Sequence, residues 1–149
     1  MSDLKQRIID DMKDFMRARD KENLEAIRLL IAKIKQKEID ERIECTDQQV
    51  TEIIIKMVKQ GKEAKAQFES GDRPELAQKE ARQIEVFSKY LPEQISEQEL
   101  EKLVEDVISE LGASSMQQMG QVMGVLKPKC QGKADMGLLS KLVKTKLSA

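Results

Sequence analysis

The sequence contains no histidine among its 149 residues. That absence excludes Ser-His-Asp and Cys-His nucleophile systems, and it removes the imidazole ligands that zinc sites commonly use. Carboxylates and lysines could still act as acids and bases, but no pair of them stands out from the many other charged residues. The sequence therefore predicts no metal site and no cofactor, and it offers no candidate catalytic residue.

Aromatic residues and long apolar runs are also scarce. There is no tryptophan, one tyrosine and three phenylalanines. No apolar run approaches the roughly 20 residues that a membrane-spanning helix needs, and the N-terminus, MSDLKQRIIDDMKD, is too acidic for a signal peptide. The two cysteines, Cys45 and Cys130, lie far apart in the sequence, which predicts reduced, structural thiols. We therefore expect a soluble, cytoplasmic protein without a membrane partner.

Charged residues make up 36% of the chain and hydrophobic residues 40%, a composition rich in Glu, Lys, Leu and Met that favours amphipathic helices. Apolar residues recur at helical spacing in seven stretches: 4–16, 24–43, 50–68, 76–91, 100–111, 116–126 and 138–147. No strand pattern and no internal repeat interrupts them. The sequence predicts an all-α fold.

Helix-capping signals place the breaks between these stretches. Capping boxes are predicted at Thr46/Gln49, Ser96/Glu99 and Ser114/Gln117, and Asp135 can cap the last helix. The segments SGDRPEL and LPEQISEQEL interrupt the helical pattern, and the second of these predicts a joint between domains. We expect an N-terminal helical-hairpin subdomain of about four helices in residues 1–92, followed by a three-helix bundle in residues 93–149.

Charge is distributed unevenly along the chain. Residues 1–91 are neutral, residues 92–112 carry a net charge of −6 and residues 113–149 carry +5. Lys127, Lys129 and Lys133 flank a turn that leads into the helix capped by Asp135, whose N-terminal N–H groups would add positive potential. The lysines have two interpretations: a solvated face that keeps the protein soluble, or a surface that binds anions.

The segment MGQVMGVLKPKCQGKADMG contains most of the glycines of this region. It is not a phosphate-binding P-loop, because Lys127 stands where the first glycine is required and Ala134 follows Lys133. Gly120 and Gly124, one helical turn apart, predict close packing of a neighbouring backbone. The methionines around them predict adaptable core filling, and Cys130 is interpreted as incidental.

The stretch GQVMGVLKPKCQGKADMGLLSKLVKTKL resembles the C-terminal signature of the GatB/YqeY group. That group comprises small bacterial YqeY-like proteins and the tail of the B subunit of the tRNA-dependent Asp/Glu amidotransferase. The stretches LKQRIIDDMKDFMRARDKENLEAIRLL and VKQGKEAKAQFESGDRPELAQKEARQIEVFSKYLPEQISEQEL are similar to the YqeY side of the group. Gly61 departs from the pattern, because such proteins often carry arginine there.

The resemblance implies an all-α architecture and, because the homologous tail looks like a tRNA-contacting module, contact with tRNA or another structured RNA. The positions that match the family motif are Gly120, Met123, Gly124, Lys127, Gly132, Lys133 and Ala134. The candidate nucleic-acid-binding residues are Lys127, Lys129, Gly132, Lys133, Lys141 and Lys144. No aromatic residue follows Tyr90, so contacts should be made to phosphates rather than by base stacking.

Three functions follow as hypotheses. The first is a non-catalytic RNA-binding accessory module. The second is an adaptor that binds a protein partner through the N-terminal helices. The third is a carbon–nitrogen ligase or amidotransferase that uses glutamine as amido donor; this label would be inherited by homology, because in the related enzyme the chemistry belongs to other domains and subunits.

Overall fold

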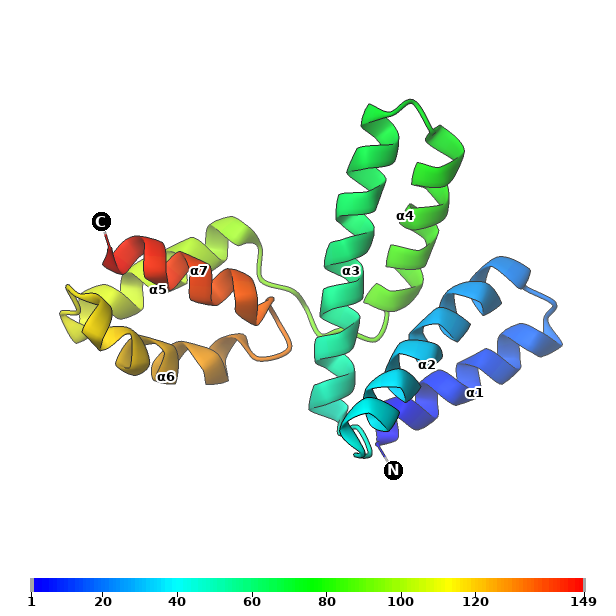
Figure 1. The fold of residues 1–149 in the computed structure, drawn as a ribbon, viewed down its shortest axis with the longest axis horizontal. Helices are drawn as coiled ribbons and strands as arrows, with labels where there is room; N and C mark the ends of the chain where they lie inside the picture. Colours follow the sequence, from blue (N-terminus) through cyan, green and yellow to red (C-terminus); the bar gives the residue numbers. More distant parts are fainter. Residues whose placement is uncertain (1, 149) are drawn as a thin grey trace. The chain divides into compact units, whose positions relative to one another are not determined.

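A computed structural model describes residues 2–148 and consists, over that range, of seven α-helices and one short 3₁₀ turn without any strand (Figure 1). The elements are α1 (Asp3–Arg17), α2 (Lys21–Glu41), α3 (Asp47–Ser70), α4 (Pro74–Ser88), α5 (Glu97–Leu111), η1 (Met116–Gln118), α6 (Met119–Cys130) and α7 (Met136–Leu147). The all-α prediction is confirmed. The chain divides into two compact units, unit 1 (Met1–Leu91) and unit 2 (Pro92–Ala149).

The helix termini lie where side chains satisfy the otherwise unpaired N–H groups. Thr46 and Gln49 form the predicted capping box at the start of α3, and Pro74 occupies the first turn of α4. Ser96 accepts a hydrogen bond from the Glu99 N–H at 3.1 Å at the start of α5. Gly112 ends α5 with a φ of 62°, a left-handed conformation that glycine adopts without a steric penalty.

Unit 1 is built from two helical hairpins, α1–α2 and α3–α4 (Figure 1). Helix α2 packs against α1, α3 and α4, so its buried residues connect the two hairpins. The core contains the following buried residues: Ile8, Ala26, Ile27, Leu30, Ile34, Cys45, Val50, Ile54, Val58, Val86, Phe87 and Tyr90.

Polar contacts between different helices reinforce this core. The Lys5 ammonium group on α1 lies 2.8 Å from both carboxylate oxygens of Glu38 on α2, and each of these side chains is only 14% exposed. The Cys45 N–H donates to the same carboxylate at 2.9 Å. The Lys5 hydrogen bond, followed by the Cys45 N–H, lowers the pKa of Glu38. This partly buried pair therefore connects α1, α2 and the loop before α3.

Tyr90, just after α4, provides a second such contact. Its hydroxyl donates to the Asp11 carboxylate on α1 at 2.5 Å, and the Arg7 guanidinium lies 5.0 Å from the centre of its ring. Burial, assisted by the hydrogen bond to Asp11, raises the pKa of Tyr90 far above its ordinary value. Tyr90 thus holds the end of the second hairpin to the first helix.

Unit 2 is a bundle in which α5, α6 and α7 each contact the other two (Figure 1). Its core contains Leu100, Val104, Val107, Val122, Leu126, Cys130, Ala134, Leu139, Val143 and Leu147. The predicted Ser114/Gln117 capping box is wrong by one residue. The helix enters through η1, and the Gln118 side chain accepts hydrogen bonds from the N–H groups of Ser114 and Ser115 at 2.7 and 3.3 Å.

Candidate nucleic-acid interface

The turn between α6 and α7, residues 131–135, holds the centre of the predicted interface. Gly132 adopts a φ of 76°, which explains the glycine at this position. Its carbonyl accepts from the Gln94 side-chain amide at 2.8 Å, and the Lys133 carbonyl accepts from the Ile95 N–H at 2.8 Å. Ala134 is buried in the core. The backbone of the turn therefore fastens the segment before α5, while the Lys133 side chain is exposed.

The start of α7 carries a carboxylate of the chain itself. The Asp135 carboxylate caps the helix and accepts a hydrogen bond from the Gly137 N–H at 3.3 Å. A carboxylate at a helix N-terminus compensates the partial positive charge of the N–H groups there. An anion approaching these groups would therefore meet the chain's own carboxylate, which opposes the attraction that the sequence predicts there.

The structure groups some of the predicted lysines and separates others. Lys127 and Lys129 are both exposed in the last turn of α6, but residues two apart on an α-helix point about 200° away from each other. Lys141 and Lys144, three apart on α7, lie about 60° from each other on the side opposite the buried Leu139 and Val143. The pair on α7 thus forms a continuous basic surface, whereas the pair on α6 does not.

The local environment distinguishes lysines with a structural role from those without one. Lys127, Lys129 and Lys144 lie in the last turns of α6 and α7, where a cation is favoured by the helix dipole. Lys146 lies 2.6 Å from the Glu105 carboxylate on α5, and this hydrogen bond raises the pKa of Lys146. Lys133 and Lys141 lie at no helix C-terminus, and neither takes part in an ion pair within residues 2–148.

Gly120 and Gly124 do not pack against a neighbouring backbone, so that prediction is wrong. Both are exposed, and a Cβ atom added to either would meet no atom within 4 Å. The reason is the helical phase: Val122 and Leu126 point into the core, and a residue two positions earlier points about 200° away. The two glycines lie instead on the solvent side of α6, near Lys127.

Most methionines of unit 2, and its cysteine, belong to the core. Met119 and Met123 pack against it, although Met116 is 42% exposed and does not. Cys130 is fully buried, and burial raises the pKa of its thiol despite the opposing effects of Lys129 and Lys133. A thiol in this environment is a core residue with low reactivity.

No cluster of metal-ligating side chains occurs among residues 2–148. In the same part of the chain, no helix combines the length and apolarity needed to cross a bilayer.

Sequence reasoning missed the polar contacts of unit 1 and an exposed leucine on α2. Leu29 is 45% exposed, although it lies beside the fully buried Leu30. The available signal was the run AIRLLIA, which holds more apolar residues than one helix face can bury. The Lys5–Glu38 pair left no comparable signal, since its members are 33 residues apart in a chain full of lysine and glutamate.

Comparison with known proteins finds relatives among fungal proteins. Two are named "Altered inheritance of mitochondria protein 41, mitochondrial". The one from Kluyveromyces lactis is 32% identical over 119 residues, which cover 76% of this chain and 64% of that protein. The one from Pyrenophora tritici-repentis is 28% identical over 130 residues, which cover 86% of this chain and 71% of that protein. An uncharacterised protein from Schizosaccharomyces pombe is 30% identical over 83 residues, which cover 56% of this chain and 68% of that protein.

These names correct one expectation drawn from the sequence. The predicted cytoplasmic location is contradicted, because the relatives from K. lactis and P. tritici-repentis are both named as mitochondrial proteins. The predicted family is confirmed, since the match to the family described as "Yqey-like protein" extends over residues 5–147. With nearly its whole length covered by that match, the chain belongs to the Yqey-like protein family.

Proposed function

We propose that unit 2 binds structured RNA, with tRNA as the first candidate, through its exposed lysines and without altering the RNA chemically. The observation that carries this proposal is the pair Lys133 and Lys141, which are exposed and have neither an ion-pair partner within residues 2–148 nor a helix C-terminus to stabilise. Surface lysines of this kind neutralise phosphates and release counterions. The resemblance of the C-terminal stretch to the tRNA-contacting tail of the amidotransferase B subunit supports the same function.

The composition of unit 2 defines the mode of binding. Residues 92–149 contain no aromatic side chain on which a base could stack, so recognition would rest on phosphate contacts and on the shape of the RNA. Gly120 and Gly124 leave the solvent side of α6 bare beside Lys127. A phosphate backbone could therefore approach that helix closely.

The test is a titration of labelled tRNA with the wild-type chain and with the variant Lys133→Ala/Lys141→Ala. We expect the variant to bind about tenfold more weakly, and its log–log salt slope to fall by roughly 0.7 to 0.9 for each phosphate that it no longer neutralises. The matched control is Lys13→Ala/Lys62→Ala, which removes two exposed lysines from unit 1. Equal weakening by both variants, or no binding by the wild type at low salt, would reject the proposal.

A further inference from the structure

The exposed Leu29 lines two of three neighbouring depressions on unit 1. Their volumes are about 340, 280 and 250 Å³. The first and second share Leu29, the first and third share Glu25, and the second and third share Gln83. The apolar residues along them come from three helices, and we call this surface the Leu29 groove: Leu24, Leu29 and Ala32 of α2, Met57 and Ala64 of α3, and Phe87 of α4.

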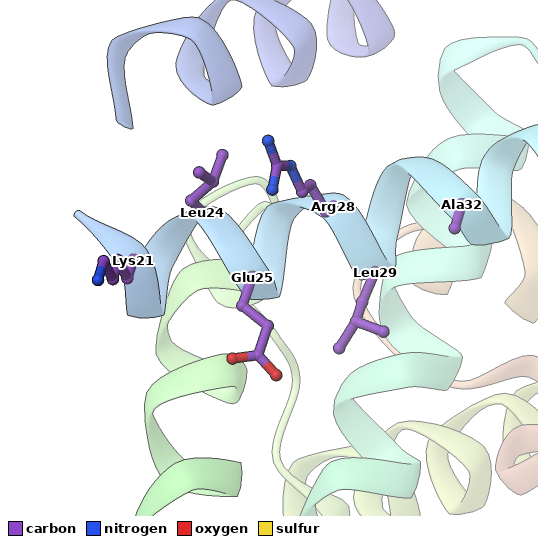
Figure 2. Close-up of a pocket in the computed structure, with 6 residues that line it drawn as sticks. All are labelled: Lys21, Leu24, Glu25, Arg28, Leu29 and Ala32. Carbon is purple, nitrogen blue, oxygen red and sulfur yellow. The ribbon is translucent and has the colours of Figure 1, made fainter. Parts of the chain in front are cut away.

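The shape of the groove suits an elongated occupant. The first depression is lined by α2 alone, from Lys21 to Ala32, so it is a shallow surface feature (Figure 2). In Figure 2, Leu29 and Glu25 project from α2 to one side and Leu24 and Arg28 to the other. These 12 residues extend about 16 Å along the helix. Adjoining depressions, each at or below the usual size of a small-molecule pocket, fit several side chains of a helix better than one small ligand.

Ion pairs fix one wall of the groove. Lys79 on α4 lies 3.0 Å from the Glu25 carboxylate on α2, and Arg82 lies 2.5 Å from that of Glu22. These exposed pairs lie where α2 packs against α4, so part of the groove is formed before any partner binds.

The charges that line the groove are predominantly positive along α2. The carboxylates of Glu22 and Glu25 already pair with cations of α4, so they do not neutralise the cations of α2. Lys21, Arg28 and Lys33 border the groove and take part in no ion pair within residues 2–148. Glu80 is the opposing carboxylate on the α4 side. The rim of this apolar surface is therefore basic along α2.

We propose that the Leu29 groove binds an amphipathic helix of a partner protein, whose apolar stripe covers Leu29 and whose acidic flank faces Lys21, Arg28 and Lys33. An aliphatic floor with a basic rim complements a helix that carries leucine-type residues at i, i+4 and i+7 and carboxylates beside them. RNA fits this surface less well, because phosphate contacts to the basic rim would leave the apolar floor around Leu29 uncovered. This site lies in unit 1 and is independent of the RNA contact proposed for unit 2.

The experiment selects partners without prejudging their charge. A display library of helical 14-residue peptides is panned against the full chain, and the enriched peptides are labelled and titrated by fluorescence anisotropy. We expect enriched sequences to be net acidic with an apolar stripe. Leu29→Glu should weaken their binding about tenfold or more, because a buried anchor is replaced by a charge that repels the peptide. Lys21→Glu/Arg28→Glu/Lys33→Glu should weaken it by a similar factor and reduce its salt dependence.

The controls separate docking from folding. Leu76→Glu places the same charge on a leucine of similar exposure, 41% against 45%, that lies outside the Leu29 groove, and it should leave binding unchanged. Ala32→Glu, at an exposed position within the groove, is a second disruptive variant. Far-UV circular dichroism and urea midpoints verify that each variant is folded. Absence of enrichment, enrichment of basic peptides, or equal binding to wild type and Leu29→Glu would overturn the proposal.

Two further outcomes would assign the groove to another occupant and so reject the proposal. Self-association of the wild type in sedimentation velocity, abolished by Leu29→Glu, would identify a second copy of this chain. Loss of tRNA binding in Leu29→Glu would identify RNA. Lys133→Ala/Lys141→Ala should leave peptide binding intact, so the failure of one proposal can be told from the failure of the other.

Discussion

In unit 1, charged side chains from different helices pair with one another at three places, whereas in unit 2 five lysines between Lys127 and Lys144 form no ion pair within residues 2–148. The Lys5–Glu38 pair joins α1 to α2, and Tyr90 binds Asp11. Unit 2 relies on its apolar core, on backbone hydrogen bonds around the α6–α7 turn, and on the Lys146–Glu105 contact. The difference indicates that charge contributes to the fold of unit 1 and remains at the surface of unit 2.

The largest expected loss of stability comes from creating a cavity in the core of unit 2, on which that unit depends. Leu139→Ala removes a fully buried side chain and should destabilise unit 2 by about 3 kcal/mol. The only tyrosine, Tyr90, lies in unit 1 and there is no tryptophan, so tyrosine fluorescence reports on unit 1 while circular dichroism reports on both units. In urea we expect part of the dichroism transition to move to lower concentration and the fluorescence transition to stay. Equal shifts of both signals would show that the two units unfold as one.

Breaking the partly buried ion pair of Lys5 and Glu38 tests the other half of the comparison. Glu38→Gln leaves the Lys5 ammonium group without its carboxylate and should destabilise unit 1 by about 2 kcal/mol, given that each side chain is 14% exposed. For this variant the tyrosine fluorescence transition should move to a lower urea concentration, because Tyr90 lies in unit 1. Glu63→Gln, an exposed position on α3, is the matched control and should have little effect.

The same pair predicts how stability depends on pH. The pKa of Glu38 is lower in the folded chain than the ordinary value of 4.5, so its contribution is fully present above pH 4.5. The contribution is lost as the pH falls from 4.5 through the folded pKa. Wild type should therefore lose more stability than Glu38→Gln over this range; parallel pH profiles would contradict the role assigned to the pair.

The contact of Tyr90 with Asp11 should have a smaller effect. Tyr90→Phe keeps the ring beneath Arg7 but removes the hydroxyl that donates to the Asp11 carboxylate at 2.5 Å. We expect a loss of about 1.5 kcal/mol, because the acceptor is charged and partly buried. Calorimetry measures this variant, which has no tyrosine fluorescence. An unchanged unfolding temperature would show that water replaces the hydroxyl without cost.

The smallest predicted effect has the opposite sign. Gly124→Ala should stabilise unit 2 by about 0.8 kcal/mol, because alanine favours the helix and its Cβ would meet no atom within 4 Å. Gly132→Ala should instead destabilise it by about 1 kcal/mol, since φ is 76° there. Urea titration of both variants compares the two glycines. If Gly124→Ala destabilised the protein, that result would support the close packing predicted from the sequence.

Several features of the fold were predictable because they depend on neighbouring residues alone. Thr46, Gln49 and Pro74 act within one helical turn, so their capping roles follow from local geometry. The prediction for Ser114 failed by one residue because Ser115 also fits the pattern and the helix begins with a 3₁₀ turn. The lysines of the candidate interface were identifiable as residues, but not their grouping, which depends on the helical phase set by the core.

The sequence by itself determined that this chain is helical, where the helices lie to within a few residues, and that it belongs to its family. Helical periodicity and capping depend on neighbouring residues, and a family motif can be recognised from the sequence alone. The tertiary structure decided which side of α6 Gly120 and Gly124 occupy, which carboxylate Lys5 meets, and that Leu29 stays exposed between three helices. Those outcomes depend on which faces of helices far apart in the sequence pack against one another, and the sequence pattern of a single helix does not contain that information.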